Sequence, residues 1–177
     1  EMGLGKTVVT LTALYNLMYD RFEIGKALVI APLRVAEDTW SRESEKWDHL
    51  QGLTISKILG TPTQRRRALA READIYIINR ENVVWLCDEL SQVGDGWMFD
   101  AVVIDELSSF KSPKAQRFRA LRKYISRSSR VIGLTGTPAP NGLIDLWSQI
   151  YLLDGGERLG KTISGYRERY FTPNQRN

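Results

Sequence analysis

The stretch Glu1-Met2-Gly3-Leu4-Gly5-Lys6-Thr7 opens the chain and indicates a phosphate-binding loop. Gly3 and Gly5 let the backbone approach an anion closely, because neither residue carries a Cβ. Lys6 can reach the outer phosphates of a nucleotide, and the Thr7 hydroxyl can ligate Mg²⁺. The first seven residues therefore predict a nucleotide site.

The loop pattern is G-x-x-x-x-G-K-[ST], and its first position would fall one residue before Glu1. The strand that should lead into the loop would also precede Glu1, so we expect the chain to be a fragment of a longer protein. Residues 8–19 have a helical period, which would place the loop at a helix N-terminus, where unpaired N–H groups favour negative charge.

Composition is that of one globular domain, with 177 residues of which 42% are hydrophobic and 26% charged. The net charge of +4 is consistent with a polyanionic partner, although a basic protein without a nucleic-acid role stays an alternative. The one cysteine, Cys87, excludes an internal disulfide, and we expect it to be buried. No apolar run approaches 18 residues, so no membrane span is expected, and the compartment is predicted to be intracellular and reducing.

Apolar runs and helical periods alternate along the chain. The expected strands are 27–31, 53–59, 75–78, 101–104 and 131–135, and the expected helices include 8–19, 35–47, 64–72, 82–93 and 143–153. Short continuous apolar runs are typical of strands that are covered on both faces. The alternation predicts an α/β fold with one doubly wound, mainly parallel sheet and helices on both faces.

Two carboxylates, Asp105 and Glu106, directly follow the apolar run 101–104. The carboxyl ends of strands are where open α/β sheets bind ligands. Asp105 suits a partner for Mg²⁺, and Glu106 suits polarising a water for attack on a γ-phosphate. The alternative is an acidic turn that faces solvent.

In order along the chain, these motifs resemble superfamily II helicase-like ATPases of the Swi/Snf class, which translocate on double-stranded DNA. The residues that carry the resemblance are Glu1–Thr7 (motif I), Ala31-Pro32-Leu33-Arg34 with Trp40 (motif Ia), Ile104-Asp105-Glu106 (motif II) and Leu134-Thr135-Gly136-Thr137-Pro138 with Asn141 (motif III). The short connections resemble compact bacterial or phage-encoded members. The resemblance implies a RecA-like P-loop NTPase lobe that uses ATP and Mg²⁺.

The resemblance also implies roles for single residues. Residues 3–7 (Gly3, Leu4, Gly5, Lys6 and Thr7) would bind ATP, with Thr7 and Asp105 serving Mg²⁺. Glu106 would be the catalytic base or water-orienting group, assisted by Lys6 and Asp105. The resemblance further implies DNA-backbone contacts by Pro32, Leu33, Arg34 and Asn79, and coupling of the two sites by Thr135, Gly136, Thr137 and Asn141. An ordinary polar loop or helix cap stays an alternative for Arg34 and Asn79.

Domain organisation follows from the same resemblance. Residues 1–153 would form the first lobe without its first strand, and residues 154–177 would begin the connection toward a second RecA-like lobe that supplies arginines. We therefore expect the chain alone to hydrolyse ATP very poorly and to be marginally stable. Ser108 stands where the family usually has His, which puts coupling to motif III in question.

The leading hypothesis is a DNA-stimulated ATPase motor with double-stranded DNA as partner. Two alternatives stay open: a superfamily II motor directed at RNA or single strands, and a non-hydrolysing DNA-binding scaffold with a relic ATP site. The expected location is the cytoplasm of a bacterium or a phage-infected host, or the nucleus if the source is eukaryotic.

Overall fold

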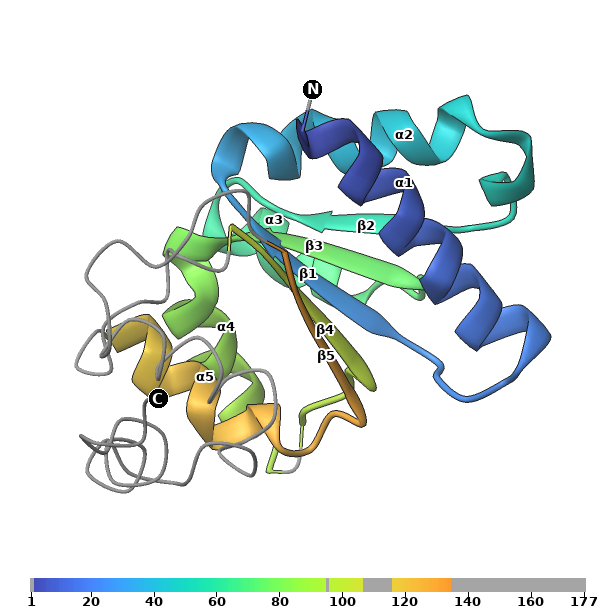
Figure 1. Ribbon diagram of the computed structural model, residues 1–177. Helices are drawn as coiled ribbons and strands as arrows, with labels where there is room; N and C mark the ends of the chain where they lie inside the picture. Colours follow the sequence, from blue (N-terminus) through green and yellow to red (C-terminus); the bar gives the residue numbers. More distant parts are fainter. Residues whose placement is uncertain (1, 95, 107–115, 135–177) are drawn as a thin grey trace, which may run out of the picture.

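A computed structural model describes residues 2–94, 96–106 and 116–134, with side chains from Thr7 onward. Its centre is a five-stranded sheet in the order β2-β3-β1-β4-β5 (Figure 1). Each neighbouring pair of strands is parallel. The strands are β1 (Ala27–Ala31), β2 (Ile55–Ile58), β3 (Ile75–Asn79), β4 (Ala101–Asp105) and β5 (Arg130–Leu134). The predicted parallel sheet is confirmed.

The three central strands differ from the two outer ones in burial. Every residue of β1, β3 and β4 is buried, because helices cover both faces of these strands. The outer strands β2 and β5 are only partly buried, and Arg130 at the start of β5 is exposed. Continuous apolar runs in the sequence therefore correspond to the centre of the sheet.

Helices lie on both faces of the sheet (Figure 1). One face carries α1 (Met2–Tyr15) with the π-helical turn η1 (Asn16–Asp20), then the π-helical turn η2 (Val35–Thr39) and α2 (Trp40–Lys46). The other face carries α3 (Pro62–Ala70), α4 (Val83–Ser91) and α5 (Gln116–Ile125). Two short 3₁₀ turns are η3 (Asp48–Leu50) and η4 (Arg80–Asn82). None of the described helices combines the length and apolar composition that a membrane span requires.

The core divides into two clusters because successive side chains of a strand point to opposite faces. Leu28, Ile30 and Ile104 pack with residues of α3, α4 and α5. Val29 and Val103 pack with residues of α1, η2 and α2 on the opposite face. Each fully buried side chain of this size contributes about 1.5–3 kcal/mol relative to an exposed one. The cluster in which a strand residue packs therefore shows which helices cover its face of the sheet.

The start of α1 differs from the prediction of an open loop over Glu1–Thr7. The backbone from Met2 onward is helical, so the helix begins about six residues earlier than the predicted residue 8. A helical start lets the carbonyl groups of these residues accept bonds from the next turn of the helix. The prediction of an open loop over these residues is therefore wrong for Met2–Thr7, which form the first turns of α1.

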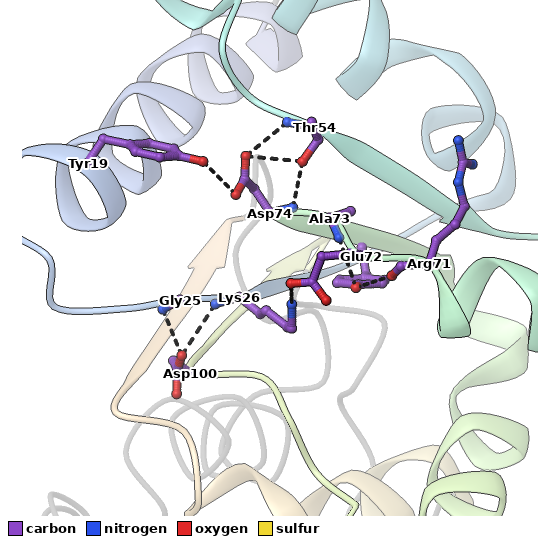
Figure 2. Close-up of polar contacts among 10 residues, drawn as sticks. Tyr19, Gly25, Lys26, Thr54, Arg71, Glu72, Ala73, Asp74 and Asp100 are labelled. Carbon is purple, nitrogen blue, oxygen red and sulfur yellow. Dashed lines mark hydrogen bonds and ion pairs between the residues drawn. The ribbon is translucent and has the colours of Figure 1, made fainter.

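The amino edge of the sheet, where the strands begin, is held by polar contacts (Figure 2). We define it by Lys26, Thr54, Asp74 and Asp100, each of which directly precedes a strand. Asp74 accepts hydrogen bonds from the Thr54 amide at 3.0 Å and the Thr54 hydroxyl at 3.1 Å. Asp100 accepts from the Gly25 amide at 2.7 Å and the Lys26 amide at 3.3 Å. These carboxylates fasten neighbouring loops to one another.

Most other predicted elements agree with the structure within two or three residues. Cys87 is buried in α4, as expected. A capping box between Thr61 and Gln64 begins α3, in which each side chain bonds the other residue's backbone N–H. The predicted helix 143–153, the coupling residues 135–141 and the connection 154–177 lie outside the described residues.

Candidate nucleotide and nucleic-acid site

Parallel strands bring several predicted site residues to one edge of the sheet. Ala31 of β1 pairs with Asn79 of β3, and Ile30 pairs with Ile104 of β4. This register places Asp105 level with Ala31 and Asn79, although the three residues are far apart in the sequence. We call Pro32, Asn79, Asp105 and Glu106 the carboxyl edge, because each ends or directly follows a strand.

Asp105 is buried on the face that α1 and α2 cover. Residues two apart in a strand point to the same face, so the side chain of Asp105 lies on the face of Val103, which packs in the cluster beneath these helices. The indole Nε1 of Trp40 donates a hydrogen bond to Asp105 Oδ2 at 3.2 Å. Only 8% of Asp105 and none of Trp40 is exposed. A buried carboxylate with a fixed donor has a defined orientation, which a metal ligand requires.

Glu106 has a strained backbone, with φ at 62°. A residue with a Cβ rarely adopts this left-handed conformation, which costs about 1–3 kcal/mol. The turn occurs immediately after the buried strand β4 and leaves Glu106 partly exposed, next to the buried Asp105. Strain of this kind is concentrated at functional sites, so the turn supports a chemical role for Glu106.

Thr7 lies on the same face of the sheet as Asp105. Buried positions in the first helical segment recur at Thr7, Leu11, Leu14 and Met18, which is the spacing of one helix face. A short connection joins the end of this segment to the start of β1, so α1 runs back along the sheet and begins toward the carboxyl edge (Figure 1). Thr7, the first of these buried residues, therefore places its hydroxyl near the end of the sheet that carries Asp105. The backbone of Gly3, Leu4, Gly5 and Lys6 forms the helical turn before Thr7.

The donors at this edge fit Mg²⁺ bound together with a nucleotide. Mg²⁺ prefers oxygen ligands and is commonly held by one or two carboxylates plus substrate phosphates and waters. Asp105 supplies a carboxylate and Thr7 a hydroxyl on one face of the sheet. The described residues contain no group of three or more His, Cys, Asp and Glu side chains that could hold a metal by themselves. Asp105 and Thr7 would supply two of the oxygen ligands of Mg²⁺, with phosphate oxygens and waters as further ligands.

The predicted DNA-contacting residues have two different environments. Leu33 is 47% exposed and Arg34 is exposed, just before η2 at the end of β1. Asn79 is buried, and its side-chain amide is used within the protein. Its Nδ2 donates to Glu81 Oε1 at 3.0 Å, and its Oδ1 accepts from Asn82 Nδ2 at 2.9 Å. Arg34 is thus accessible to a ligand, whereas Asn79 organises the turn after β3.

A basic groove of about 530 Å³ lies between β2, α3 and η2. Its cationic lining residues are Lys57, Arg67 and Arg71, and Glu37 is its one acidic lining residue. Lys57 Nζ donates to the backbone oxygen of Glu37 at 2.6 Å, which brings the groove close to η2. Within the described part of the chain, neither Arg67 nor Arg71 forms an ion pair. The groove therefore carries uncompensated positive charge.

Two features of this region were not predicted from the sequence. The sequence places Trp40 beside motif Ia but gives no indication that its indole reaches Asp105. The run Arg65-Arg66-Arg67 indicates only a basic helix. In the structure Arg65 stacks over the Trp85 ring at 4.7 Å, and Arg66 pairs with Glu89 at 2.7 Å, so only the third arginine of the run lines the groove.

Together, the parallel doubly wound sheet, the paired carboxylates after β4 and the hydroxyl of α1 on the same face define a RecA-like α/β lobe. The family model for the SNF2-related domain matches residues 1–165, so the chain belongs to this family. It is a helicase-like first lobe of the Swi/Snf class. At the level of the family, this indicates a domain of an ATPase-type hydrolase.

Similar sequences come from a phage and from fungi. "Putative protein p41" of Acyrthosiphon pisum secondary endosymbiont phage 1 is 45% identical over 176 residues, which cover 96% of this chain and 38% of the relative. Helicase SWR1 of Mycosarcoma maydis is 33% identical over 86% of this chain and 8% of the relative. Helicase SWR1 of Saccharomyces cerevisiae is 30% identical over 95% of this chain and 11% of the relative. The chain thus spans well under half the length of these relatives.

A solved structure supports the same assignment. The Sulfolobus solfataricus SWI2/SNF2 ATPase core, in complex with dsDNA, aligns with a TM-score of 0.76 and 29% sequence identity. The match covers 98% of this chain and 34% of that chain. The RecA-like fold predicted from the sequence is therefore confirmed.

Proposed function

We propose that this chain is the first lobe of an ATP-dependent DNA translocase, binding ATP–Mg²⁺ and the backbone of duplex DNA. The carboxyl edge carries this proposal, because it combines a buried, oriented Asp105 with a strained Glu106 at the end of β4. The homologous ATPase core in complex with dsDNA favours duplex DNA over the alternatives. Residues 1–153 would form the lobe, and residues 154–177 would lead toward a second lobe.

Different residues of this chain would bind the phosphates, bind Mg²⁺ and orient the attacking water. Lys6 would contact the outer phosphates, while the Thr7 hydroxyl and the Asp105 carboxylate would hold Mg²⁺, and residues 3–5 (Gly3, Leu4 and Gly5) would complete the phosphate contact. Glu106 would orient a water and accept its proton. ATP supplies the transferable phosphoryl group, and Mg²⁺ supplies charge that offsets the charge of the phosphates.

DNA would contact the surface next to this edge. Arg34 is exposed there, and the basic groove formed by Lys57, Arg67 and Arg71 adjoins η2, the turn that follows Arg34. Phosphate contacts by cations are independent of base sequence and weaken with salt. Contacts by Pro32, Leu33 and Asn79, and coupling by Thr135, Gly136, Thr137 and Asn141, are also part of the proposal.

The decisive experiment measures ATP hydrolysis by the protein at its full natural length with no nucleic acid, duplex DNA, single-stranded DNA or RNA. Lys6→Ala provides the control that removes phosphate binding. Strong stimulation by duplex DNA that Lys6→Ala abolishes is the expected result. A preference for single strands or RNA would assign the protein to another branch of superfamily II, and nucleotide binding without turnover would favour a scaffold.

A further inference from the structure

Trp40 belongs to motif Ia, and its side chain points into the core, away from the proposed DNA surface. It begins α2, directly after η2 ends at Thr39, and its ring is fully buried against the sheet. Its indole N–H reaches Asp105 across 65 positions of sequence. The ring lies in the same cluster as Val29, Ala31 and Val103, so packing holds the donor in place.

The chemistry of this contact is directional. An indole can donate one hydrogen bond and accept none, whereas a carboxylate has two oxygens with about four acceptor positions. The bond to Oδ2 therefore restricts the rotation of the carboxylate. Groups that bond a metal ligand in this way set its orientation, and their loss commonly weakens metal binding about 10–100-fold.

We infer that Trp40 is a positioning residue for Mg²⁺, which orients Asp105 through its indole N–H and links the segment that begins at Pro32 to the metal site. The inference rests on the proposed function, since it concerns the metal used with ATP. In this role Trp40 is not itself a ligand of the metal; it acts through Asp105. A residue of motif Ia and a proposed ligand of the nucleotide site thus belong to one packed unit.

The test replaces Trp40 by Phe in the protein at its full natural length. Phe keeps an apolar ring but has no donor for Asp105. The readout is equilibrium binding of a fluorescent ATP analogue as the Mg²⁺ concentration is varied. We expect the Mg²⁺ concentration for half-saturation to rise about 10–100-fold in Trp40→Phe, with binding near the wild-type level at saturating Mg²⁺.

Trp47→Phe is the matched control. Trp47 directly follows α2, and its Nε1 donates to Glu43 Oε1 at 3.0 Å, so this variant also removes an indole–carboxylate bond but leaves Asp105 untouched. Its Mg²⁺ dependence should equal that of the wild type. Circular dichroism and thermal unfolding check that both variants are folded. If Trp40→Phe does not fold, benzothienylalanine at position 40, which replaces the N–H by sulfur in a ring of similar size, provides the same test.

The outcomes separate this inference from the function on which it rests. An unchanged Mg²⁺ dependence in folded Trp40→Phe, with normal wild-type binding, would overturn the inference alone. An equal shift in Trp47→Phe would also overturn it, because the effect would then belong to the region of α2 in general. A wild-type protein that shows no Mg²⁺-dependent nucleotide binding would remove both the proposed function and this inference.

Discussion

The two ends of β4 carry aspartates with different surroundings. Asp100, before the strand, accepts hydrogen bonds from the backbone amides of Gly25 and Lys26, and so joins two loops (Figure 2). Asp105, at the end of the strand, is buried and bonded by the indole of Trp40. The first contact joins two loops, whereas the second orients a carboxylate beside a strained turn. The acid before β4 thus has a structural role, whereas the acid at its end is a candidate for a catalytic one.

The beginnings of the other strands resemble the beginning of β4. At the amino edge, Asp74 bonds Thr54 and Tyr19, and Lys26 pairs with Glu72, so polar groups there satisfy one another (Figure 2). At the carboxyl edge Asn79 is also bonded within the protein, but Arg34, which lies beside this edge, is exposed. Substitutions at the amino edge should therefore change stability, and those at the carboxyl edge should change binding or turnover.

The largest expected effect is that of Glu106→Gln on turnover. An amide cannot accept a proton from the attacking water, so ATP turnover in the presence of duplex DNA should fall about 10²–10⁴-fold while nucleotide binding persists. The measurement is steady-state hydrolysis by the protein at full natural length. Glu72→Gln makes the same chemical change at a residue that pairs with Lys26 of the amino edge, and it should leave turnover unchanged. Equal losses in the two variants would break the distinction between the edges.

Asp74→Ala should mainly affect folding. The carboxylate accepts from the Thr54 amide, the Thr54 hydroxyl and the Tyr19 hydroxyl, so its loss leaves donors of η1 and of the loop before β2 without this acceptor. We expect the free energy of unfolding to fall by about 1–3 kcal/mol, measured by urea denaturation. Nucleotide affinity should stay at the wild-type value. A loss of nucleotide binding without a loss of stability would contradict a purely structural amino edge.

Charge in the basic groove should act on DNA affinity through salt dependence. Replacing Arg67 and Arg71 by Ala should reduce the slope of log K against log[salt] by about 1–2, because each phosphate contact contributes about 0.9. Fluorescence anisotropy with a labelled duplex measures this slope. The control is Arg66→Ala, since Arg66 is already paired with Glu89. An equal change in the control would show that net charge, and not the groove, governs binding.

The smallest expected effect concerns pH at the amino edge. A hydrogen bond from its hydroxyl to the Asp74 carboxylate raises the pKa of Tyr19 above its ordinary value of 10.0. Because the folded pKa is the higher one, the stabilisation is fully present below pH 10.0 and is lost as the pH rises through the folded pKa. Solvent screening limits the contribution to at most about 1 kcal/mol.

Comparing the wild type with Tyr19→Phe isolates this contribution. The difference between their free energies of unfolding should be present at about pH 8 and should vanish at strongly alkaline pH, where Tyr19 is ionised in both states. Urea denaturation at several pH values gives the difference. A difference that does not change with pH would mean that the bond to Asp74 does not alter the protonation of Tyr19.

Strands were predicted well because their signal is local. Residues 27–31 form β1 as predicted, and the apolar run 101–104 extends by one residue to include Asp105. Both segments are central, so burial on two faces requires a continuous apolar run that is visible in the sequence. The start of α1 was predicted wrongly as a loop, because Gly3 and Gly5 permit a loop conformation but do not exclude a helix.

The site was only partly predictable. The sequence identified Asp105 and Glu106 as a pair. It did not predict the left-handed backbone of Glu106, because glutamate rarely adopts that conformation. DNA contact by Asn79 and Arg34 stays a prediction. In the structure the two residues differ, because Asn79 is buried and its side chain is hydrogen-bonded within the protein, whereas Arg34 is exposed.

The sequence by itself determined the parallel α/β class, the central strands and the acids at the end of β4, because periodicity and strand ends depend on neighbouring residues. Tertiary structure alone decided that Trp40 bonds Asp105 and that Arg67, unlike Arg66, lines a groove. These partners depend on sheet register and on the packing of helices from distant segments. A hydrogen bond across 65 positions is set by that packing, and no local pattern encodes it.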